Sequence, residues 1–364
     1  MKHALIPIII FAAGFMLSAG AQNHPDFDIT HQCKTSSVKS QDRAGTCWAY
    51  TAVSFLESEI LRKGGETYDL SEMYIVRNVY PVKAERYIRM HGNNNFGQGG
   101  QAHDAISAFA NQGMVPESVY PGINYGGEIH NHAVLERNLK TTVEYFTNTK
   151  RGLPENWINH YEAVLDGFLG KKPETFEYKG KSYTDKSFAR QLDIKPDDYV
   201  EISSYSHHKF NAPFVLEVPD NWSHDLYYNV TIDDLLAIMK NSLENGYSVS
   251  WDGDVSGDGF NHKKEGKAVL LDKEKALLKE KGAQEFRQIL FNNFTATDDH
   301  LMHLTGLAKD EAGNVWFQTK NSWGADSNEY GGYLYMSEDY IKGMTIAIMV
   351  HKDAIPKSIQ KKLF

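Results

Sequence analysis

The segment from Gln41 to Trp48, QDRAGTCW, places a thiol at the start of a helix-like run of residues. A thiol at a helix N-terminus feels the positive end of the backbone dipole, which favours the thiolate form of Cys47. The amide of Gln41, six residues earlier, can donate an N–H group to a developing oxyanion. The segment therefore predicts half of an acyl-transfer site, and the other half must be a histidine with an orienting group further along the chain.

Two histidines are candidates for this second half. His300 and His303 lie at the start of a predicted strand, and the next predicted strand ends in the motif Asn-Ser-Trp-Gly at 321–324. Residues an odd number apart on a strand face opposite ways. Only one of the two histidines can therefore face Cys47, and alternation alone does not say which.

The order of these residues resembles the papain-type cysteine peptidases. The hallmark motifs are Gln41-x-x-x-Gly-x-Cys47-Trp and Asn-Ser-Trp-Gly, and further agreement comes from segments 70–72, 99–100 and 113–121. The resemblance implies an α+β, papain-like two-lobe fold. A helical lobe would carry Cys47, and a β-barrel-like lobe would carry the histidine and Asn321.

Within that group the chain resembles the bleomycin hydrolase/aminopeptidase C branch (peptidase family C1, subfamily B). Ala44 stands where secreted papain-like enzymes carry a disulfide cysteine, and the branch lacks that cysteine. The separation of Cys47 from His300 is far longer than the usual separation of about 130–150 residues. Segments 206–211 and 251–255 resemble the flanks of the branch's helical insertion. The resemblance implies a peptidase domain over 22–364, with an inserted subdomain at about 125–198.

The resemblance also assigns roles. In the family a glycine follows the catalytic histidine by six residues; His300 has Gly306 at that offset, so His303 is interpreted as a packing or surface histidine. Cys47 would be the nucleophile, as thiolate, and His300 its ion-pair partner and proton donor. Asn321 would accept a hydrogen bond from the other ring nitrogen and fix the tautomer.

The remaining roles concern the substrate. Gln41 and the backbone N–H of Cys47 would hold the oxyanion. By resemblance, Trp323 would shield the histidine–asparagine hydrogen bond. Gly99 and Gly100 would present backbone groups to an extended substrate, because glycine has no side chain to block the approach.

Helical patterns dominate the first part of the chain and strand patterns the last third, which favours an α+β class over alternating βαβ units. Helices are predicted at 101–112, 140–148, 157–168 and 233–245, besides the run after Cys47, and a hairpin at 175–183. Strands are predicted at 200–204, 214–218, 247–251, 301–308, 315–321, 333–336 and 347–350.

Composition narrows the class of partners. The 364 residues are 41% apolar and 23% charged, an ordinary globular profile, with a formal net charge of −9. An acidic chain without a long Lys/Arg run is not expected to bind nucleic acid.

The first residues are typical of a secretory signal peptide. Lys2 gives a basic start, residues 4–17 are mostly apolar, and the small residues Ala19 and Ala21 predict cleavage before Gln22. We therefore predict a signal peptide at 1–21 and a protein exported to the periplasm or the extracellular space, with no membrane contact after cleavage. An uncut membrane anchor is the alternative interpretation, disfavoured because a span needs about 20 apolar residues.

Cys33 and Cys47 are the only cysteines. They could pair as a redox switch, but a small buried residue is the favoured interpretation of Cys33.

No metal and no cofactor are predicted. The adjacent pair His207 and His208 is expected to point apart, as neighbours on a strand do. The segment that begins at Asp252 mimics a calcium loop, but its twelfth position is Lys263 instead of the closing glutamate.

The predicted function is hydrolysis of peptide or protein substrates, most simply as an aminopeptidase. The branch is usually cytosolic and hexameric, which implies a homo-oligomer, and its C-terminal arm occupies the groove. Here eight residues follow Pro356, a length that spans at most about 29 Å. An endopeptidase, another thiol amidase or acyl transferase, and an inactive binding homologue therefore stay open as alternatives.

Overall fold

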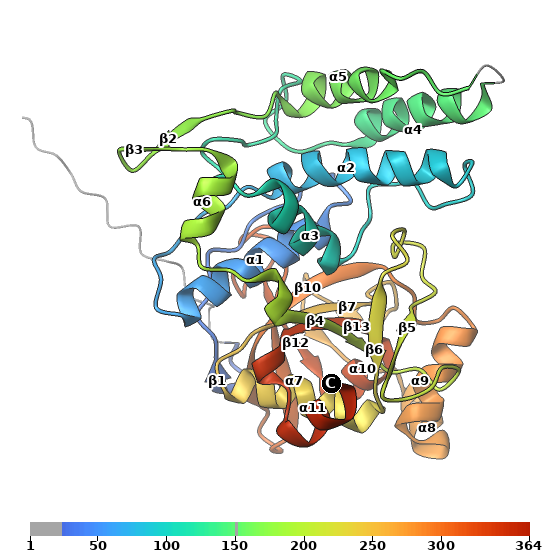
Figure 1. Cartoon of the computed structure of the whole chain (residues 1–364). Coiled ribbons are helices and arrows are strands. Elements are labelled where there is room, and N and C mark those ends of the chain that lie inside the picture. The colour runs from blue at the N-terminus through green and yellow to red at the C-terminus, as the bar shows by residue number, and fades with distance from the viewer. Residues whose placement is uncertain (1–23, 150–151) are drawn as a thin grey trace, which may run out of the picture.

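Two hydrophobic cores organise the computed structural model, which describes residues 24–149 and 152–364. One core lies among helices and the other lies against a large sheet, as the separation of elements in Figure 1 shows. The predicted signal peptide, 1–21, lies outside the described residues. None of the described helices combines the length and the apolar character that crossing a membrane requires.

The helical core is built around α1 (Cys47–Arg62), which packs against α2 (Glu72–Arg89) and α3 (Ala102–Gln112). The helix α1 is buried on nearly all sides because strands of the sheet cover the face that α2 and α3 leave open. The side chain of Ser71 caps α2 by accepting the backbone N–H of Tyr74. The cysteine of the sequence motif is thus the first residue of the most enclosed helix in this lobe.

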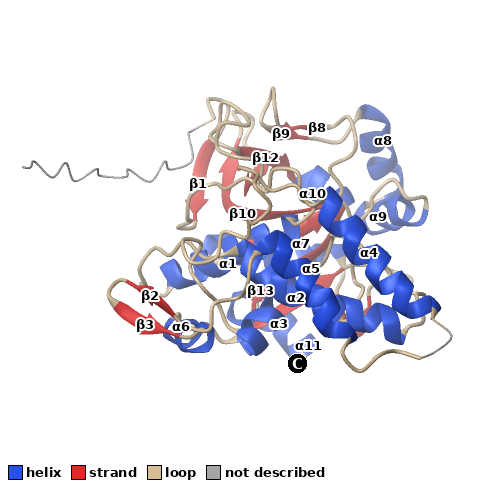
Figure 2. Cartoon of the chain, turned by 90° about the horizontal axis from the view of Figure 1, so that it is seen from above, coloured by secondary structure: helices blue, strands red, loops and turns tan. Residues whose placement is uncertain are grey.

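Segment 125–198 extends the helical lobe. It contains α4 (Ala133–Asn148), α5 (Trp157–Leu169), β2 (Phe176–Tyr178), β3 (Lys181–Tyr183), α6 (Asp185–Gln191) and the 3-10 turn η1 (Pro196–Asp198). Figures 1 and 2 both show α4 and α5 stacked beside α2. Their buried residues, Leu139 and Tyr161 among them, join the core around α1. The segment predicted as an inserted subdomain therefore shares its hydrophobic core with the lobe that carries it.

The second lobe contains a single eleven-stranded sheet, ordered β5-β6-β4-β13-β7-β10-β11-β12-β9-β8, with β1 added against β10. Among the described strands the two ends of this path are not paired with each other, so hydrogen bonding does not close a barrel. The strands are β1 (Asp28–Gln32), β4 (Tyr199–Ser203), β5 (Ala212–Val215), β6 (Leu226–Asn229), β7 (Val249–Gly253), β8 (Phe260–Asn261), β9 (Lys267–Ala268), β10 (His300–Lys309), β11 (Val315–Lys320), β12 (Tyr333–Ser337) and β13 (Thr345–His351).

Helix α7 (Ile232–Glu244) packs on β10, β7 and β1, and Thr231 caps it by accepting the backbone N–H of Asp234. The other elements on this lobe are α8 (Asp272–Lys281), α9 (Ala283–Asn292), α10 (Glu338–Met344), η2 (Lys352–Ala354) and α11 (Lys357–Leu363). Segment 272–292 carries helices that the sequence pattern did not predict, and α8 has no buried residue to reveal a core-facing side.

Strand β10 joins the two lobes. Leu301 belongs to the helical core, whereas Met302 and Leu304 belong to the sheet core, as alternation along a strand requires. The hydroxyl of Thr51 in α1 donates to the carbonyl oxygen of Leu301 at 2.8 Å. Ser54, one turn further along α1, bonds to Nδ1 of His303 at 2.9 Å. The register of α1 against β10 is therefore fixed by polar contacts as well as by packing.

Ser54 and Ser58 offer a matched test of this junction. Ser54 also accepts a hydrogen bond from the buried ammonium of Lys320 at 2.7 Å, whereas the buried Ser58 hydroxyl has no partner among the described residues. We expect Ser54→Ala to lower the free energy of unfolding by about 1–3 kcal/mol, because it leaves buried polar groups unsatisfied. We expect Ser58→Ala to be neutral or slightly stabilising. Urea denaturation of both variants measures the difference, and equal losses would contradict the assigned role of Ser54.

Candidate functional site

Cys47 is the first residue of α1 and is half-buried. The loop at 93–100 holds the segment that precedes it: the backbone N–H of Gly45 donates to Oε1 of Gln98 at 2.7 Å, and the indole N–H of Trp48 donates to the Gln98 carbonyl oxygen at 2.9 Å. A Cβ at Gly45 would lie 3.1 Å from Cβ of Gln98, a tight contact that would require Gln98 to shift. The thiol therefore sits on a segment that is bonded on both sides of the cysteine.

Gln41 links this segment to the Asn-Ser-Trp-Gly motif of the other lobe. Its Nε2 donates to the carbonyl oxygen of Ala44 at 2.8 Å, and its Oε1 accepts the hydroxyl of Ser322 at 2.6 Å. Its backbone N–H also donates to the carbonyl oxygen of Ser322 at 2.8 Å. A side-chain amide has two N–H groups, so one remains uncommitted. The backbone N–H of Cys47, at a helix start, has no intrahelical acceptor.

His300 and Asn321 are joined by a hydrogen bond of 2.9 Å between Nε2 and Oδ1. The backbone N–H of Ser322 donates to the same Oδ1 at 2.7 Å, which identifies that atom as the acceptor. Nε2 of His300 must therefore carry the hydrogen, and Nδ1 keeps its lone pair. The ring of Trp323 stacks on the imidazole with centroids 5.0 Å apart, so it covers the histidine face beside this hydrogen bond.

Sequence reasoning missed His262. Its ring packs edge-on against Trp323, with centroids 5.1 Å apart, and its Nδ1 lies 3.4 Å from Nδ2 of Asn321. Burial, together with the charge of His300, lowers the pKa of His262 to about 4. A neutral His262 can accept from the Asn321 amide and hold its orientation. No motif marks this histidine, because it lies in a segment considered only as a false calcium loop.

His303 faces the opposite side of β10 from His300. It is 1% exposed, bonds to Ser54 and packs edge-on against Phe55 with centroids 6.2 Å apart. Of the two interpretations offered from the sequence, packing and surface, the structure shows packing. Alternation along the strand thus separates the two histidines in the predicted way.

Burial dominates the electrostatics of the thiol. It raises the pKa of Cys47, and the backbone of Leu301, which faces the sulfur, acts in the opposite direction. Burial also lowers the pKa of His300 to about 4, against the hydrogen bond to Asn321. The helix N-terminus alone led us to expect a thiolate, but desolvation opposes either charge by itself. Transfer of a proton from a thiol to an imidazole would create two opposite charges together, with no net charge to bury.

Three aspartates near Cys47 were also missed as site residues. Asp220, Asp252 and Asp298 each raise the pKa of the thiol by their charge. Asp252 was weighed only as the start of a calcium loop, and Asp298 stands two residues before His300, a position that could have drawn attention to it.

The two glycines at 99–100 are closely covered by side chains. A Cβ at Gly99 would lie 1.8 Å from Oδ2 of Asp220, and a Cβ at Gly100 would lie 2.8 Å from Oδ2 of Asp104 and 3.1 Å from the indole of Trp48. Side chains of the protein itself therefore fill the space beside these two glycines. The sequence had led us to expect that space to be open to an extended substrate.

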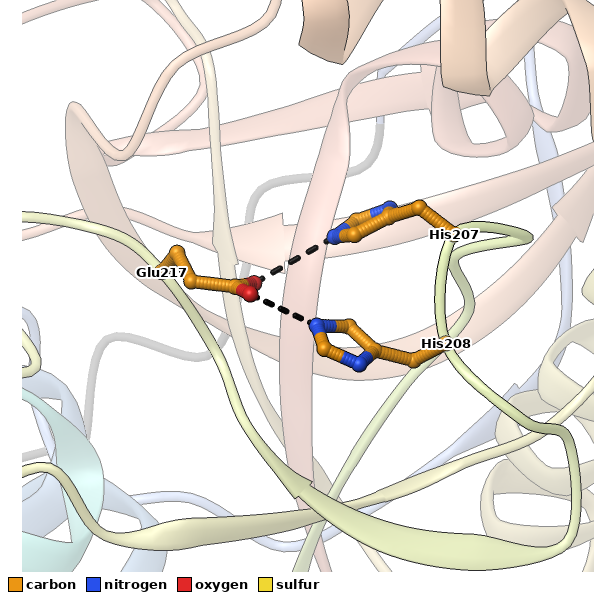
Figure 3. A group of neighbouring side chains, drawn as sticks. All are labelled: His207, His208 and Glu217. Carbon is orange, nitrogen blue, oxygen red and sulfur yellow. Dashed lines mark hydrogen bonds and ion pairs between the residues drawn. The ribbon is translucent and has the colours of Figure 1, made fainter.

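The histidine pair at 207–208 also differs from expectation. The two residues follow β4 in a turn rather than lying in a strand, and both point toward Glu217 (Figure 3). Nε2 of His207 lies 3.3 Å from one carboxylate oxygen, and Nε2 of His208 lies 2.6 Å from the other. The prediction that the rings point apart was wrong, because strand alternation does not apply to a turn.

The other two open points concern Cys33 and the end of the described chain. Both cysteines are free, and Cys33 is buried in the sheet core.

Residues 357–364 lie against the sheet lobe near α7 (Figure 1): Lys362 pairs with Asp234 at 2.8 Å, and the ring of Phe364 packs edge-on against Tyr228. These residues contact β6 and α7, so they are not laid along the segment that carries Cys47.

A thiol at a helix start in one lobe, set against a histidine–asparagine pair from a sheet in the other, is the arrangement of a papain-like cysteine peptidase. The chain belongs to the Peptidase C1-like family, whose model matches residues 13–364. It is 23% identical to Aminopeptidase G of Lactobacillus delbrueckii subsp. lactis over 90% of this chain and 84% of the relative. It is 24% identical to Aminopeptidase C of Listeria monocytogenes over 91% of this chain and 83% of the relative.

The fold is similar to a solved structure, PepW from Lactobacillus rhamnosis. The TM-score is 0.74 at 18% sequence identity, and the match covers 95% of this chain and 88% of that chain. At this identity the likeness shows the fold alone: a mixed α+β structure with a helical part and a large sheet.

The geometry predicts which thiol reacts and which histidine assists it. Iodoacetamide should modify the half-buried Cys47 and spare Cys33, which is buried in the sheet core. At pH 6 we expect His300→Ala to slow this reaction by about 10-fold or more, because the proton acceptor is lost. His303→Ala should leave the rate near that of the parent protein. Peptide mapping by mass spectrometry measures both, and slowing by His303→Ala alone would show that the wrong histidine was assigned.

Proposed function

We propose that the chain is a thiol aminopeptidase that hydrolyses peptides through an acyl-enzyme on Cys47. The observation that carries the proposal is the hydrogen-bonded connection of Gln41, Ser322, Asn321 and His300 around the start of α1. It supplies a proton acceptor, an orienting group and an oxyanion donor for one thiol. The names of the relatives support the choice of an aminopeptidase.

The chemistry begins with proton transfer. The thiol of Cys47 gives its proton to Nδ1 of His300, and the sulfur attacks the carbonyl carbon of the scissile peptide bond. The uncommitted N–H of Gln41 and the backbone N–H of Cys47 hold the oxyanion of the tetrahedral intermediate. When the C–N bond breaks, the imidazolium protonates the leaving amine and a thioester remains.

Hydrolysis of the thioester reverses these roles. Neutral His300 accepts a proton from water as the oxygen attacks the acyl carbon, and then returns it to the departing sulfur of Cys47. Asn321 keeps the imidazole in the required tautomer through both half-reactions. Trp323 and His262 hold the histidine and asparagine in place.

We also propose that the mature protein is exported, with cleavage before Gln22. The support is the sequence of residues 1–21, a basic start followed by an apolar stretch and small residues. N-terminal sequencing of the protein secreted by a host cell tests this. The hexamer implied by the resemblance stays a prediction, which sedimentation equilibrium would measure.

The proposed function makes a direct prediction on two substrates. The coumarin amide of leucine should be hydrolysed at least about 10-fold faster than its N-acetyl derivative, because one charge-assisted contact to the amine is worth that much. Cys47→Ala should abolish the release of coumarin. Equal rates on the two substrates would refute an aminopeptidase and indicate an endopeptidase.

Two variants test the assigned roles in the same assay. Gln41→Ala should lower kcat by about 10²–10³, the usual effect of losing one oxyanion donor. Asn321→Ala should reduce the rate without abolishing it, because the thiol and the imidazole both remain. Full activity of Gln41→Ala would remove this residue from the oxyanion site.

A further inference from the structure

Three carboxyl groups from separate segments meet beside Cys47. Asp252 comes from β7, Asp298 from the residues before β10, and Asp220 from the connection between β5 and β6. Oδ2 of Asp298 accepts the backbone N–H of Asp220 at 3.3 Å, and Oδ1 of Asp220 accepts the side-chain amide of Asn95 at 2.8 Å. We call Asp220, Asp252 and Asp298 the carboxylate cluster.

Asp252 has no partner for its charge. Its side chain is almost fully buried, at 3% exposure, and within the described residues neither carboxylate oxygen forms a hydrogen bond. The side chains of Asp298 and Gln101 lie close enough to act on its pKa as hydrogen-bonding groups, although neither contact has the geometry of a full hydrogen bond. Nε2 of Gln101 is likewise buried without an acceptor. Buried polar groups in proteins are nearly always hydrogen-bonded, so these atoms indicate a missing ligand.

The cluster also has no counter-ion. In the described parts of the chain, no Lys, Arg or His nitrogen lies within 4.0 Å of these three carboxylates. Lys83 acts on Asp220 and Asp298 by its charge, but its ammonium donates to the carbonyl oxygens of Gly97 and Gly99 and lies 5.4 Å from the ring centroid of Trp222. Buried charges are normally paired, so carboxyl groups without a cation in contact hold their protons. The ligand that would let this cluster ionise is a cation with N–H groups to donate.

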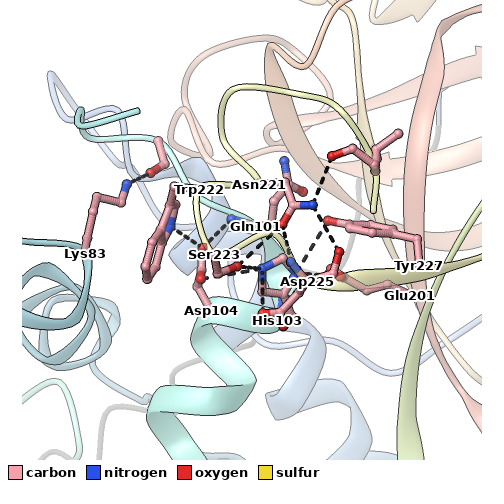
Figure 4. Close-up of polar contacts among 12 residues, drawn as sticks. Lys83, Gln101, His103, Asp104, Glu201, Asn221, Trp222, Ser223, Asp225 and Tyr227 are labelled. Atoms are coloured by element: carbon pink, nitrogen blue, oxygen red, sulfur yellow. Dashed lines mark hydrogen bonds and ion pairs between the residues drawn. The ribbon is translucent and has the colours of Figure 1, made fainter. Parts of the chain in front are cut away.

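Asp220 stands on a rigid wall that covers Gly99. The wall is the segment 220–225, held against α3 by a hydrogen bond of 2.9 Å from the indole N–H of Trp222 to Asp104 (Figure 4). The side-chain amide of Asn94 donates to the carbonyl oxygen of Trp222 at 3.0 Å. Oδ2 of Asp220 occupies the space that a side chain on Gly99 would take, so the wall lies directly over this glycine.

His103 fastens the other end of this wall. Its Nε2 bonds to Oγ of Ser223 at 2.9 Å, and its Nδ1 bonds to Glu201 at 2.5 Å, as Figure 4 shows. This resembles a serine–histidine–carboxylate relay, but the histidine cannot serve as a base. Although burial opposes the charge, Glu201 and then Asp104 raise the pKa of His103 to about 10. A protonated His103 only donates, so it ties the wall to α3.

We propose that the carboxylate cluster binds the α-ammonium group of the first substrate residue. The inference rests on the proposed aminopeptidase function and names the residues that recognise the free amino terminus. The wall stops the substrate at this residue, and the cluster supplies the missing hydrogen-bond acceptors and negative charge.

Charge balance supports the same assignment. Burial and Asp220 raise the pKa of Asp298 to about 7, and burial and Asp298 raise the pKa of Asp252. Without a cation beside it the cluster therefore retains protons, which an arriving ammonium group would displace. In its ionised form the cluster raises the pKa of Cys47. A bound cation would offset them and favour the thiolate, so a substrate with a free amine would assist its own attack.

A binding experiment separates this proposal from turnover. In the Cys47→Ala protein, calorimetry compares leucine amide with N-acetylleucine amide. We expect the free amine to bind about 10- to 100-fold tighter, the range for hydrogen bonds between charged groups. Asp252→Asn in this background should abolish most of that preference. Asp272→Asn, which changes a fully exposed aspartate of α8, is the matched control and should retain the preference.

The outcomes distinguish the two proposals. Equal binding of both amides, or a preference unchanged by both Asp252→Asn and Asp220→Asn, would overturn the cluster as the amine site. If thermal unfolding shows that Asp252→Asn is not folded, the loss of preference is measured with Asp220→Asn instead, because Asp220 lies on the half-exposed wall. The Cys47→Ala protein could bind the free amine preferentially while the parent protein, which retains Cys47, releases no coumarin. That result would support the cluster as the amine site and refute the proposed peptidase function.

Discussion

The contact of α1 with β10 is the constraint on which the site depends. It brings the first residue of a buried helix against the first residues of a strand, and so places Cys47 beside Leu301, the neighbour of His300 in the chain. The hydrogen bonds from Thr51 and to His303 fix the register of this contact. A shift of either element would move Cys47 relative to the strand that carries His300.

Desolvation gives the site its electrostatic character. Neither the thiolate of Cys47 nor the imidazolium of His300 is favoured alone in this environment, so the proposed mechanism forms the two charges together. The carboxylate cluster adds buried acids that hold their protons until a cation binds beside them. In this account the substrate's amino terminus completes the charge balance, which couples recognition of a free amine to activation of the thiol.

The sequence predicted those parts of the site that short motifs encode. Gln41 to Trp48 and Asn-Ser-Trp-Gly carry local patterns, and the strand period separated His300 from His303. The carboxylate cluster could not be predicted in this way, because Asp220, Asp252 and Asp298 come from three segments that meet only in the folded sheet. His262 was missed for the same reason. The pair His207 and His208 was misread because a turn was taken for a strand, and the exposed helix α8 lacks the apolar face that periodicity detects.

A crystal structure of the protein after reaction with leucine vinyl sulfone, which has a free amino group, tests the central claim most directly. The account predicts a covalent bond to Sγ of Cys47, the His300–Asn321 hydrogen bond intact, and the α-ammonium within hydrogen-bond distance of at least two carboxylates of the cluster. An adduct whose ammonium points to solvent and leaves Asp252 without a partner would contradict it.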